Sequence, residues 1–288
     1  MRKKILLTGG TGFIGRNILP ILQQKYTVLA PCRNELDVVN KQSVDTYMRA
    51  HQPQVIIHAA ASNPTKNPLD HSDTFQADIL QGFQNIASYQ QYVEKILYLG
   101  SGADMDKRLD MHLIKEEELG RSYPVTPYAI AKYEIAQQIR NSANMYYLRI
   151  FGCYGPTDAK TKFIRDAIDC CLEGKPISIR QNCMFDYMYV EDLAPIMDWF
   201  ITHTPKYHDY NVCTGKPVSL LEIAQIIANQ MGSTYPIQIK TQGWNKEYTA
   251  DNTRLCQEML NCVFTPLSQG VASQIKWQKG NFSHEKNG

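Results

Sequence analysis

The sequence lacks any apolar run long enough to cross a membrane as a helix. Such a helix needs about 18 consecutive apolar residues, whereas the longest run here, around residues 55–61, has the length of a strand. An excess of charge is also lacking, because 30 Lys and Arg are balanced by 28 Asp and Glu, a net charge of +2. Without a basic cluster, this balance excludes the footprint of a nucleic-acid-binding protein. We expect a globular protein with neither a membrane nor a nucleic acid as partner.

The eight cysteines follow no metal-binding or disulfide pattern. They stand at positions 32, 153, 170, 171, 183, 213, 256 and 262, with no Cys-x-x-Cys pair and no histidine at zinc-finger spacing. His203 and His208 are separated by more than one helical turn, which disfavours a metal site between them. Scattered cysteines of this kind are typical of reduced core thiols. We predict no metal site and a cytoplasmic location.

Short apolar runs alternate with helical periodicity through the first half of the chain. The runs predicted to be buried strands are residues 4–8, 27–30, 54–58, 95–100 and 145–150. Between them, the apolar spacing predicts helices at about 13–24, 43–50, 72–90 and 126–141. Strands that alternate with helices in this way form right-handed βαβ units, whose parallel sheet is covered on both faces. The predicted fold class is α/β, with a Rossmann-like doubly wound parallel sheet.

The pattern changes after about Gly155, where Gly155 and Pro156 mark the expected change of domain. Beyond this point the strands are shorter, and Ser219 and Glu222 predict a capping box for a helix that ends at Gly232. With 288 residues, the chain has room for one large domain or two modest ones. We predict a first domain over residues 1–155, to which residues 186–212 return, and a smaller C-terminal α/β domain over residues 156–288.

A glycine-rich motif gives the strongest local signal. It runs Thr-Gly-Gly-Thr-Gly-Phe-Ile-Gly over residues 8–15, directly after the first predicted strand and at the start of the first predicted helix. The glycines allow a tight turn and let a pyrophosphate approach the backbone, while free N–H groups and the positive end of the helix hold the anion. A plain glycine-rich turn is the alternative, but the strand and helix on either side favour a dinucleotide site.

The end of the second predicted strand indicates which dinucleotide binds. An NAD site usually has an acidic residue there, which bonds to the ribose hydroxyls. This strand is followed instead by Pro31, Cys32 and Arg33. Arg33 could meet a 2′-phosphate, so the sequence favours NADP(H), with NAD(H) as the alternative. In the other interpretation, Arg33 is a solvent-facing side chain beside Glu35.

Tyr128 and Lys132 are four residues apart near the start of a predicted helix, so both lie on one face. A phenol with a pKa of about 10 is a poor acid at neutral pH, but a nearby ammonium stabilises the phenolate and lowers that pKa. The phenol could then give a proton to a carbonyl oxygen as hydride reaches the carbon. Ser101 follows the fourth predicted strand, at the edge where open α/β sheets bind ligands, and its hydroxyl can bond to the same oxygen. A solvated helix face and a strand-end serine are the alternatives.

These motifs, taken together, resemble those of one enzyme family. The resemblance is carried by Ser101 and by residues 8–15, 55–61, 127–132, 154–156 and 185–193. In this order they are similar to the motifs of the extended short-chain dehydrogenase/reductases, in particular the nucleotide-sugar epimerase/dehydratase family. Residues 33–38 and 127–132 look most like those of 4-keto-sugar reductases of the GDP-L-fucose synthase type. The resemblance implies an NAD(P)-dependent enzyme acting on a nucleotide-diphosphate sugar.

The resemblance also implies a role for each matching residue. Ser101, Tyr128 and Lys132 become the catalytic triad, and Lys132 also holds the nicotinamide ribose. The expected cofactor-binding residues are Gly9, Thr11, Gly12, Phe13, Ile14 and Gly15 at the pyrophosphate, Arg33 at the 2′-phosphate, Asp37 and Val38 beside the adenine, and Ala59, Ala60 and Ala61 along the cofactor. The C-terminal domain is expected to bind the nucleotide diphosphate of the sugar, and the protein is expected to form a homodimer.

The chain departs from reductases of this type at four positions. Their two epimerase residues, a cysteine and a histidine, correspond to Ala103 and Lys162, so proton exchange at C3 and C5 is not expected. Gly152 stands where the family has asparagine, and Phe185 where it has arginine. Both family residues help to hold the substrate, which predicts a different sugar-nucleotide pocket here.

The sequence gives fewer candidate residues for binding the substrate than for binding the cofactor. Arg180 and Arg254 are the candidates for the diphosphate of the sugar, and a surface charge is the alternative for each. Loops 62–74 and 102–125 are expected to cover the substrate.

The predicted function is NADPH-dependent reduction of a nucleotide-activated 4-keto-6-deoxy sugar to the 4-hydroxy sugar. A 4-epimerase is the first alternative, because it uses the same triad. A 4,6-dehydratase needs further acid–base residues beside the serine, where Asp104 is interpreted as a loop carboxylate. The non-enzyme alternative is a dinucleotide-sensing regulator on the same fold, against which the presence of Tyr128 and Lys132 argues.

Overall fold

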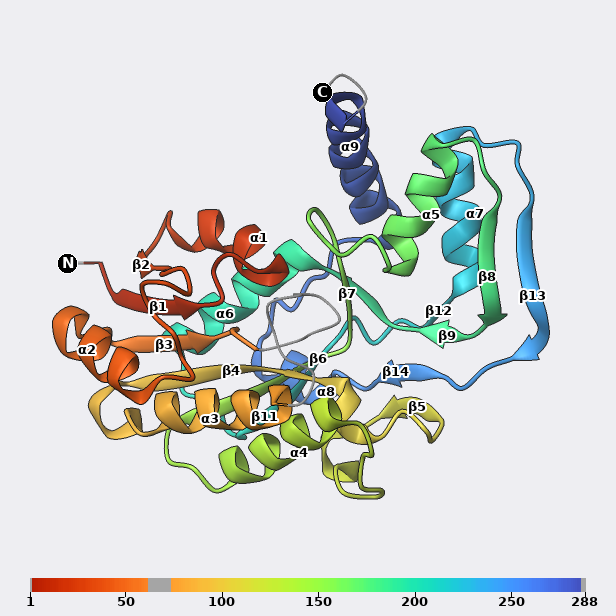
Figure 1. The fold of residues 1–288 in the computed structure, drawn as a ribbon. Coiled ribbons are helices and arrows are strands. Elements are labelled where there is room, and N and C mark those ends of the chain that lie inside the picture. The colour runs from red at the N-terminus through yellow and green to blue at the C-terminus, as the bar shows by residue number, and fades with distance from the viewer. Residues whose placement is uncertain (1, 62–73, 286–288) are drawn as a thin grey trace.

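The computed structural model describes residues 2–61 and 74–285, whose arrangement Figure 1 shows. Among these residues, a six-stranded sheet has all its neighbouring strands parallel. Its strands, in spatial order, are β11 (Asp209–Val212), β6 (Met145–Ile150), β4 (Lys95–Ser101), β3 (Val55–His58), β1 (Lys4–Thr8) and β2 (Thr27–Leu29). The chain places β2 on one side of β1 and β3 on the other, so the strand order reverses at β1. Open α/β sheets bind ligands at such a point, outside the carboxyl ends of the strands.

Helices cover both faces of this sheet (Figure 1). On one face lie α2 (Lys41–His51), α3 (Phe75–Ala87) and α4 (Pro127–Arg140), and on the other lie α1 (Phe13–Leu22) and α6 (Leu193–Thr202). Successive side chains of a strand point to opposite faces, so Leu6 belongs to the apolar core under the first group, whereas Ile5 and Leu7 belong to the core under the second. Burial on both faces explains why the strands are continuous apolar runs.

The predicted α/β class and the parallel sheet are confirmed. The five predicted strands are present, with bounds that differ by at most one residue, and four helices lie where helices were predicted. Residues 72 and 73 of the predicted helix 72–90 lie outside the described residues. Segment 102–125, expected as a loop, contains β5 (Met111–Ile114) and the short 3-10 helices η2 (Gly102–Met105) and η3 (Glu116–Glu118). β5 escaped prediction because its partner strand, β14 (Tyr248–Ala250), comes from far along the chain.

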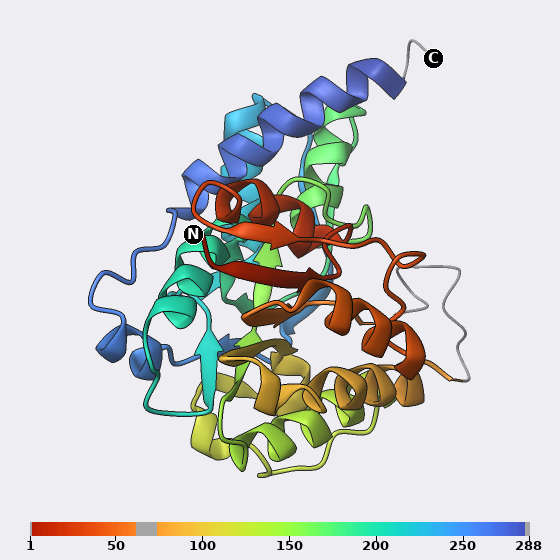
Figure 2. The same cartoon turned by 90° about the vertical axis from the view of Figure 1, so that its left-hand side faces the viewer.

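The rest of the chain forms smaller sheets with a core of their own. The paired strands are β7 (Gly152–Tyr154) with β10 (Tyr187–Tyr189), β8 (Ile177–Asn182) with β13 (Ile237–Trp244), and a mixed sheet of β12 (Val218–Ser219), β9 (Met184–Phe185), β14 and β5. The remaining helices are α5 (Phe163–Leu172), α7 (Leu220–Met231), α8 (Thr253–Glu258), α9 (Leu267–Glu285), η1 (Gln90–Tyr92) and η4 (Val190–Asp192). Helices α5, α7 and α9 pack around a third apolar core, and Figure 2 shows α9 running along the top of the molecule.

The capping box predicted for α7 is confirmed. The Ser219 hydroxyl accepts a hydrogen bond from the Glu222 N–H at 3.1 Å, and the Glu222 carboxylate accepts one from the Ser219 N–H at 2.8 Å. Gly232 ends the helix with a φ of 64°. Although both come late in the sequence, strand β11 is part of the six-stranded sheet and helix α6 packs against one of its faces. The division into domains at residue 155 stays a prediction. No helix within residues 2–61 and 74–285 is long and apolar enough to span a membrane.

Candidate active site

The glycine-rich loop between β1 and α1 depends on close backbone approaches. Gly9 has a φ of 72°, in the left-handed region, and its carbonyl oxygen accepts a hydrogen bond from the Gly12 N–H at 2.9 Å. A Cβ on Gly15 would lie 2.3 Å from the same oxygen, so only glycine lets α1 pack this closely. Helix α1 begins at Phe13 without a side-chain cap, which leaves its first N–H groups available to an anion.

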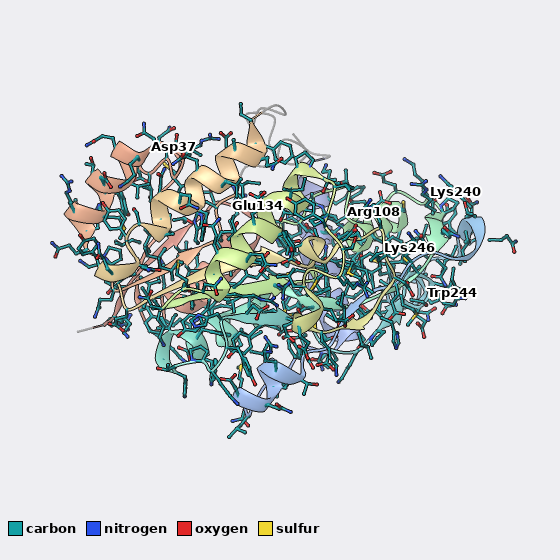
Figure 3. All side chains as sticks on the ribbon, turned by 90° about the horizontal axis from the view of Figure 1, so that it is seen from below. Asp37, Arg108, Glu134, Lys240, Trp244 and Lys246 are labelled. Carbon is teal, nitrogen blue, oxygen red and sulfur yellow. The ribbon has the colours of Figure 1, made fainter. Side chains whose placement is uncertain are left out.

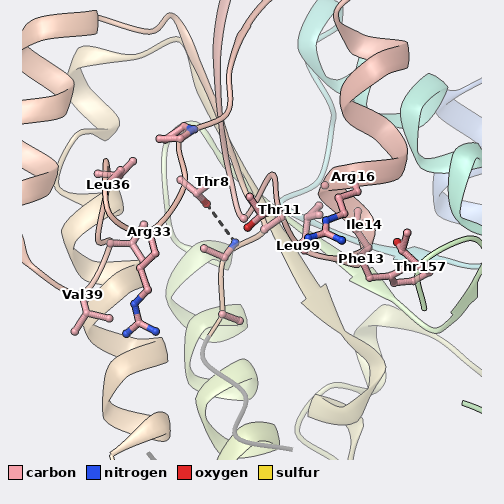
Figure 4. Close-up of a pocket in the computed structure, with 18 of the residues that line it drawn as sticks. Thr8, Thr11, Phe13, Ile14, Arg16, Arg33, Leu36, Val39, Leu99 and Thr157 are labelled. Atoms are coloured by element: carbon pink, nitrogen blue, oxygen red, sulfur yellow. Dashed lines mark hydrogen bonds between the residues drawn. The ribbon is translucent and has the colours of Figure 1, made fainter. Parts of the chain in front are cut away.

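Thr8 ties the end of β1 to the end of β3. Its hydroxyl oxygen lies 2.7 Å from Nδ1 of His58 and accepts a hydrogen bond from the Ala60 N–H at 3.2 Å (Figure 4). His58 is buried, and this burial, together with the charge of Lys132, lowers its pKa to about 3. The imidazole is therefore neutral at neutral pH. Uncharged groups hold together the two strand ends that border the glycine-rich loop.

A cavity of about 700 Å³ opens at these strand ends. All residues predicted to bind the cofactor line it, namely Gly9, Thr11, Gly12, Phe13, Ile14, Gly15, Arg33, Asp37, Val38, Ala59, Ala60, Ala61 and Lys132. Its size lies within the usual range of cofactor pockets. A dinucleotide fits these residues, because the glycines keep the backbone open where a pyrophosphate must approach it.

Two arginines from different segments line this cavity. Arg33, after β2, lies beside Val39, whereas Arg16, in the first turn of α1, lies on the side of Thr157 (Figure 4). Arg33 was predicted and Arg16 was not. Arg16 directly follows the last glycine of the motif, in the first turn of α1. This position was the signal in the sequence that could have identified it.

The residues just after the predicted domain change were also missed. Thr157, Asp158 and Ala159 line the cavity. The side-chain amide of Asn17 on α1 donates to the Pro156 carbonyl oxygen at 2.8 Å, which fixes this segment against α1. The Gly-Pro pair at 155–156 predicts a turn, but it does not indicate that the residues after the turn line the cavity.

Tyr128 and Lys132 both line the cavity from α4. The Lys132 ammonium donates to the Tyr98 hydroxyl at 2.7 Å and to the Leu99 carbonyl oxygen at 3.1 Å. It lies 5.6 Å from the centre of the Tyr128 ring. The predicted pair is therefore brought together, with the ammonium directed at β4.

The pKa of Tyr128 is shifted upward, opposite to the expected net direction, and the lowering effect expected of Lys132 stays a prediction. Burial raises the pKa of Tyr128, and the opposing effect comes from the Ser101 hydroxyl. The hydrogen bonds of the Lys132 ammonium go to Tyr98 and to the backbone of β4. At neutral pH, Tyr128 is a protonated phenol, which is the form that can donate a proton.

Ser101 ends β4 directly after Leu99 and Gly100, two residues of the cavity wall. Its hydroxyl oxygen accepts a hydrogen bond from the Ala103 N–H at 3.2 Å, and its own N–H donates to the Tyr147 hydroxyl at 3.2 Å. Hydrogen bonding to Ser101 lowers the pKa of Tyr128 against the effect of burial, and the Lys132 ammonium donates to the Leu99 carbonyl oxygen. The three predicted catalytic residues are therefore neighbours at the carboxyl end of β4.

A buried ion pair includes Asp104, which lies in the short helix η2 directly after Ser101. Nε of Arg149 lies 2.9 Å from both carboxylate oxygens of Asp104, and both side chains are fully buried. Burial works against the charge of Arg149, but Asp104 and the nearby Asp209 hold the pKa of its guanidinium above the usual range. Asp104 was interpreted as a loop carboxylate; it is instead part of the core, which its place in the short helix η2 explains.

The two arginines predicted to bind the substrate do not line the cavity. Arg254 lies in a separate shallow pocket, where its guanidinium donates to Asp209 at 2.8 Å and to Glu117 at 3.1 Å. Arg180 is exposed on β8. Of the loop 62–74, residues 62–73 lie outside the described part of the chain.

Two departures from the family pattern have structural partners. A Cβ on Gly152 would lie 2.3 Å from the Asp186 carbonyl oxygen, so the close pairing of β7 with β10 excludes an asparagine there. The ring of Phe185 stacks on that of Tyr187, with 5.2 Å between centroids. An aromatic pair therefore occupies the place of the family's arginine.

Fold and cavity define the class of protein. A dinucleotide-sized cavity lies at the reversal of a parallel sheet, a tyrosine and a lysine line it, and a serine ends the strand beside it. This is the arrangement of a short-chain dehydrogenase/reductase. The sequence model of the family described as "NAD dependent epimerase/dehydratase family" matches residues 5–213. The chain belongs to this family, and it is an NAD(P)-dependent enzyme that modifies nucleotide sugars.

Individual relatives agree with this assignment. The chain is 29% identical over 261 residues to a GDP-L-colitose synthase of Yersinia pseudotuberculosis, which covers 80% of this chain and 82% of the relative. It is 26% identical over 277 residues to a GDP-L-fucose synthase of Azorhizobium caulinodans, with 88% and 85% covered.

Solved structures share the fold at lower identity. A GDP-L-fucose synthetase of Naegleria fowleri bound to NADP superposes with a TM-score of 0.85 at 19% identity, over 98% of this chain and 94% of that one. MlghC, a GDP-mannoheptose C4 reductase of Campylobacter jejuni with NADP bound, gives a TM-score of 0.82 at 18% identity, over 96% and 98%. These matches support the architecture described above.

Proposed function

We propose that the protein uses NADPH to reduce a nucleotide-activated 4-keto-6-deoxy sugar to the 4-hydroxy sugar, without epimerisation at C3 or C5. One observation supports the proposal: Tyr128 and Lys132 line the same cavity as the glycine-rich loop and Arg33, and Ser101 directly follows Leu99 and Gly100 of its wall. Similarity to a GDP-L-colitose synthase and to a C4 reductase supports it.

Each of the three residues can have a different role in the reduction at C4. When bound, NADPH supplies the hydride that C4 receives. Ser101 can donate a hydrogen bond to the oxygen, and Tyr128 can protonate it, because burial keeps the phenol in its protonated form. Lys132 is fixed by Tyr98 and Leu99, so its charge is in place to stabilise the phenolate that proton transfer leaves behind.

Arg33 supports NADPH as the preferred cofactor. Its side chain lines the cavity after β2, where an NAD site usually has a carboxylate. Arg33→Ala should weaken NADPH binding by at least about tenfold, because a charge-assisted bond to phosphate is lost, and should leave NADH binding unchanged. Arg49→Ala, on the exposed face of α2, is the matched control. If wild-type protein bound NADH as tightly as NADPH, the preference would be withdrawn.

Ala103 supports reduction without epimerisation. It is buried in η2, two residues after Ser101, and its methyl group has no proton to exchange. Lys162, the second position in question, is the residue before α5. Turnover in D2O should therefore give a product without deuterium at C3 or C5. Deuterium at either carbon would show that another residue performs the epimerisation.

The direct test is turnover of 4-keto sugar nucleotides. Each should consume NADPH stoichiometrically if it is a substrate, and Tyr128→Phe should lower kcat by about 10²-fold or more without changing NADPH affinity. Tyr133→Phe, on the same helix and half-buried, is the control for loss of a phenol hydroxyl. A 4-epimerase would instead interconvert two sugars with no net change in NADPH absorbance. Unchanged turnover of Tyr128→Phe would remove Tyr128 from the mechanism.

The wider setting follows from the same proposal. The substrate is a nucleotide-diphosphate sugar, bound by the C-terminal part of the chain beyond residue 155. We further propose a cytoplasmic homodimer. Light scattering on the purified protein tests the dimer, and a monomer across the concentration range would contradict it.

A further inference from the structure

Tyr248, in the late strand β14, brings a second buried phenol to the catalytic serine. Its side chain is buried, and hydrogen bonding to Ser101 works against the rise that burial causes in its pKa. A Cβ on Gly102 would lie 2.6 Å from the Tyr248 hydroxyl oxygen. Any side chain at the position after Ser101 would therefore displace this phenol. Glycine at position 102 leaves room for a hydroxyl that comes from the other end of the chain.

Backbone pairing holds Tyr248 from two sides. It pairs with Met111 of β5 and with Phe185 of β9. Just before it, the Lys246 ammonium donates to the Arg108 carbonyl oxygen, and Figure 3 shows these two residues next to each other. The segment that carries Tyr248 is thus fixed to the segment that follows the catalytic serine.

Aromatic packing fixes the ring as well as the backbone. The centroid of the Tyr248 ring lies 5.1 Å from that of Phe151 and 5.3 Å from that of Phe185. The Lys107 ammonium lies 4.1 Å from its centre. None of these contacts uses the hydroxyl, so Tyr248→Phe removes the hydroxyl and keeps the packing.

The hydrogen-bonding capacity of Ser101 gives this hydroxyl a role. A serine has two acceptor lone pairs and one proton. One lone pair accepts from the Ala103 N–H at 3.2 Å. Burial raises the pKa of Tyr248 well above its usual value, so the phenol keeps its proton and can donate to the second lone pair. The serine proton is then left for Tyr128, whose pKa the contact with Ser101 lowers.

We propose that Tyr248 is a positioning residue of the active site, whose hydroxyl donates to Ser101 and so keeps the serine proton on the side where Tyr128 and the substrate carbonyl oxygen lie. A donor held in this way needs no reorientation when negative charge develops on that oxygen. Tyr248 acts through Ser101 and does not itself transfer the proton. The kinetic consequence rests on the proposed reductase function, whereas the orientation of Ser101 does not.

A double-mutant cycle tests the kinetic consequence. Tyr248→Phe should lower kcat by about tenfold, the effect of one lost hydrogen bond, with KM for NADPH unchanged. In a Ser101→Ala background, the same change should have no further effect on kcat. Tyr154→Phe, which removes another buried phenol hydroxyl bonded to the Leu267 carbonyl, is the control. An equal loss in both backgrounds, or no loss in either, would overturn the proposal.

A substrate-free titration separates this inference from the proposed function. With 3-fluorotyrosine placed at position 128, fluorine NMR reports the ionisation of that phenol alone. Tyr248→Phe should raise its midpoint by about 0.5 to 1 pH unit, because the serine proton is no longer directed at the phenolate. Tyr154→Phe should not move it, and Tyr248→Phe should add nothing in the Ser101→Ala background. An unmoved midpoint would overturn the orientation of Ser101, whereas a moved midpoint without turnover of any 4-keto sugar would sink only the reductase function.

Discussion

The cofactor cavity and the catalytic edge of the same sheet are built in different ways. The cavity wall combines the backbone of the glycine-rich loop with apolar side chains and with charged ones such as Arg33 and Lys132. Beside the loop, the ends of β1 and β3 are joined by the neutral pair Thr8 and His58. Behind Ser101, by contrast, lies the fully buried ion pair of Asp104 and Arg149. The ends of β1 and β3 are thus joined without charge, whereas the surroundings of Ser101 depend on a buried ion pair.

The two regions differ in whether a short sequence motif or contacts between distant segments determine their structure. The cavity needs close backbone approaches between neighbours in sequence, such as Gly9 and Gly15, which a short motif can specify. The catalytic edge needs partners from separate segments, because Arg149 is on β6 and its partner Asp104 is in η2. Disrupting the cavity should therefore weaken cofactor binding, whereas disrupting the ion pair near Ser101 should lower the stability of the fold.

The largest expected effect is on the buried ion pair. Asp104→Ala removes the nearest counter-charge of the buried Arg149 guanidinium and leaves Asp209, at 3.5 Å, which should cost about 3–5 kcal/mol in the free energy of unfolding. Urea denaturation measures it. Glu173→Ala, which breaks the exposed pair with Lys175, should cost less than about 1 kcal/mol. Equal costs for the two variants would contradict the importance given to the buried pair.

The next effect is on the glycine-rich loop. Gly15→Ala places a Cβ 2.3 Å from the Gly9 oxygen, so the loop must open, and NADPH affinity should fall by at least about 10²-fold, equivalent to about 3 kcal/mol. Fluorescence titration with NADPH measures the affinity. Gly280→Ala is the matched control, because its Cβ would meet no atom within 4 Å. Full NADPH affinity in Gly15→Ala would show that the loop does not hold the pyrophosphate.

A smaller effect concerns the pH dependence that His58 introduces. The unfolded chain takes up a proton on this residue near pH 6.5, whereas the folded protein does so near 3. The unfolded state therefore binds more protons between these values, and stability falls as pH falls below 6.5, by about 2 kcal/mol at pH 5. His58→Asn should flatten this slope in denaturation curves, and the exposed His112→Asn should not. Identical slopes in wild type and His58→Asn would show that His58 titrates normally.

The smallest effect is expected in the C-terminal part. Ser219→Ala removes the cap of α7, which should lower the free energy of unfolding by about 1 kcal/mol and leave NADPH affinity unchanged. Thermal unfolding monitors it, with the exposed Ser268→Ala as control. A change in NADPH affinity would mean that the two regions are coupled more closely than their contacts indicate.

Much of the fold was predictable because its determinants are local. The five strands and their helices follow from apolar periodicity, and the cavity from one motif of eight residues and the strands around it. Strand β5 was not predictable, because only its pairing with β14 makes it a strand. The same holds for the position of Tyr248, whose hydroxyl lies beside Gly102.

The proximity of the proposed catalytic residues was predictable from the sequence, but their electrostatics were not. The spacing of Tyr128 and Lys132 placed both in the cavity. The spacing could not reveal that the Tyr98 hydroxyl and the Leu99 carbonyl would take the lysine's hydrogen bonds. Burial therefore decides the direction of the Tyr128 pKa.

The pairing of β5 with β14 also bears on how the protein is made. Synthesis proceeds from the N-terminus, and domains fold in that order as the chain emerges. The glycine-rich loop, β1 and β3 can come together early, whereas β5 meets its partner only after Tyr248–Ala250 has been translated. A ribosome-bound intermediate should therefore acquire a dinucleotide pocket well before the surroundings of Ser101 are complete.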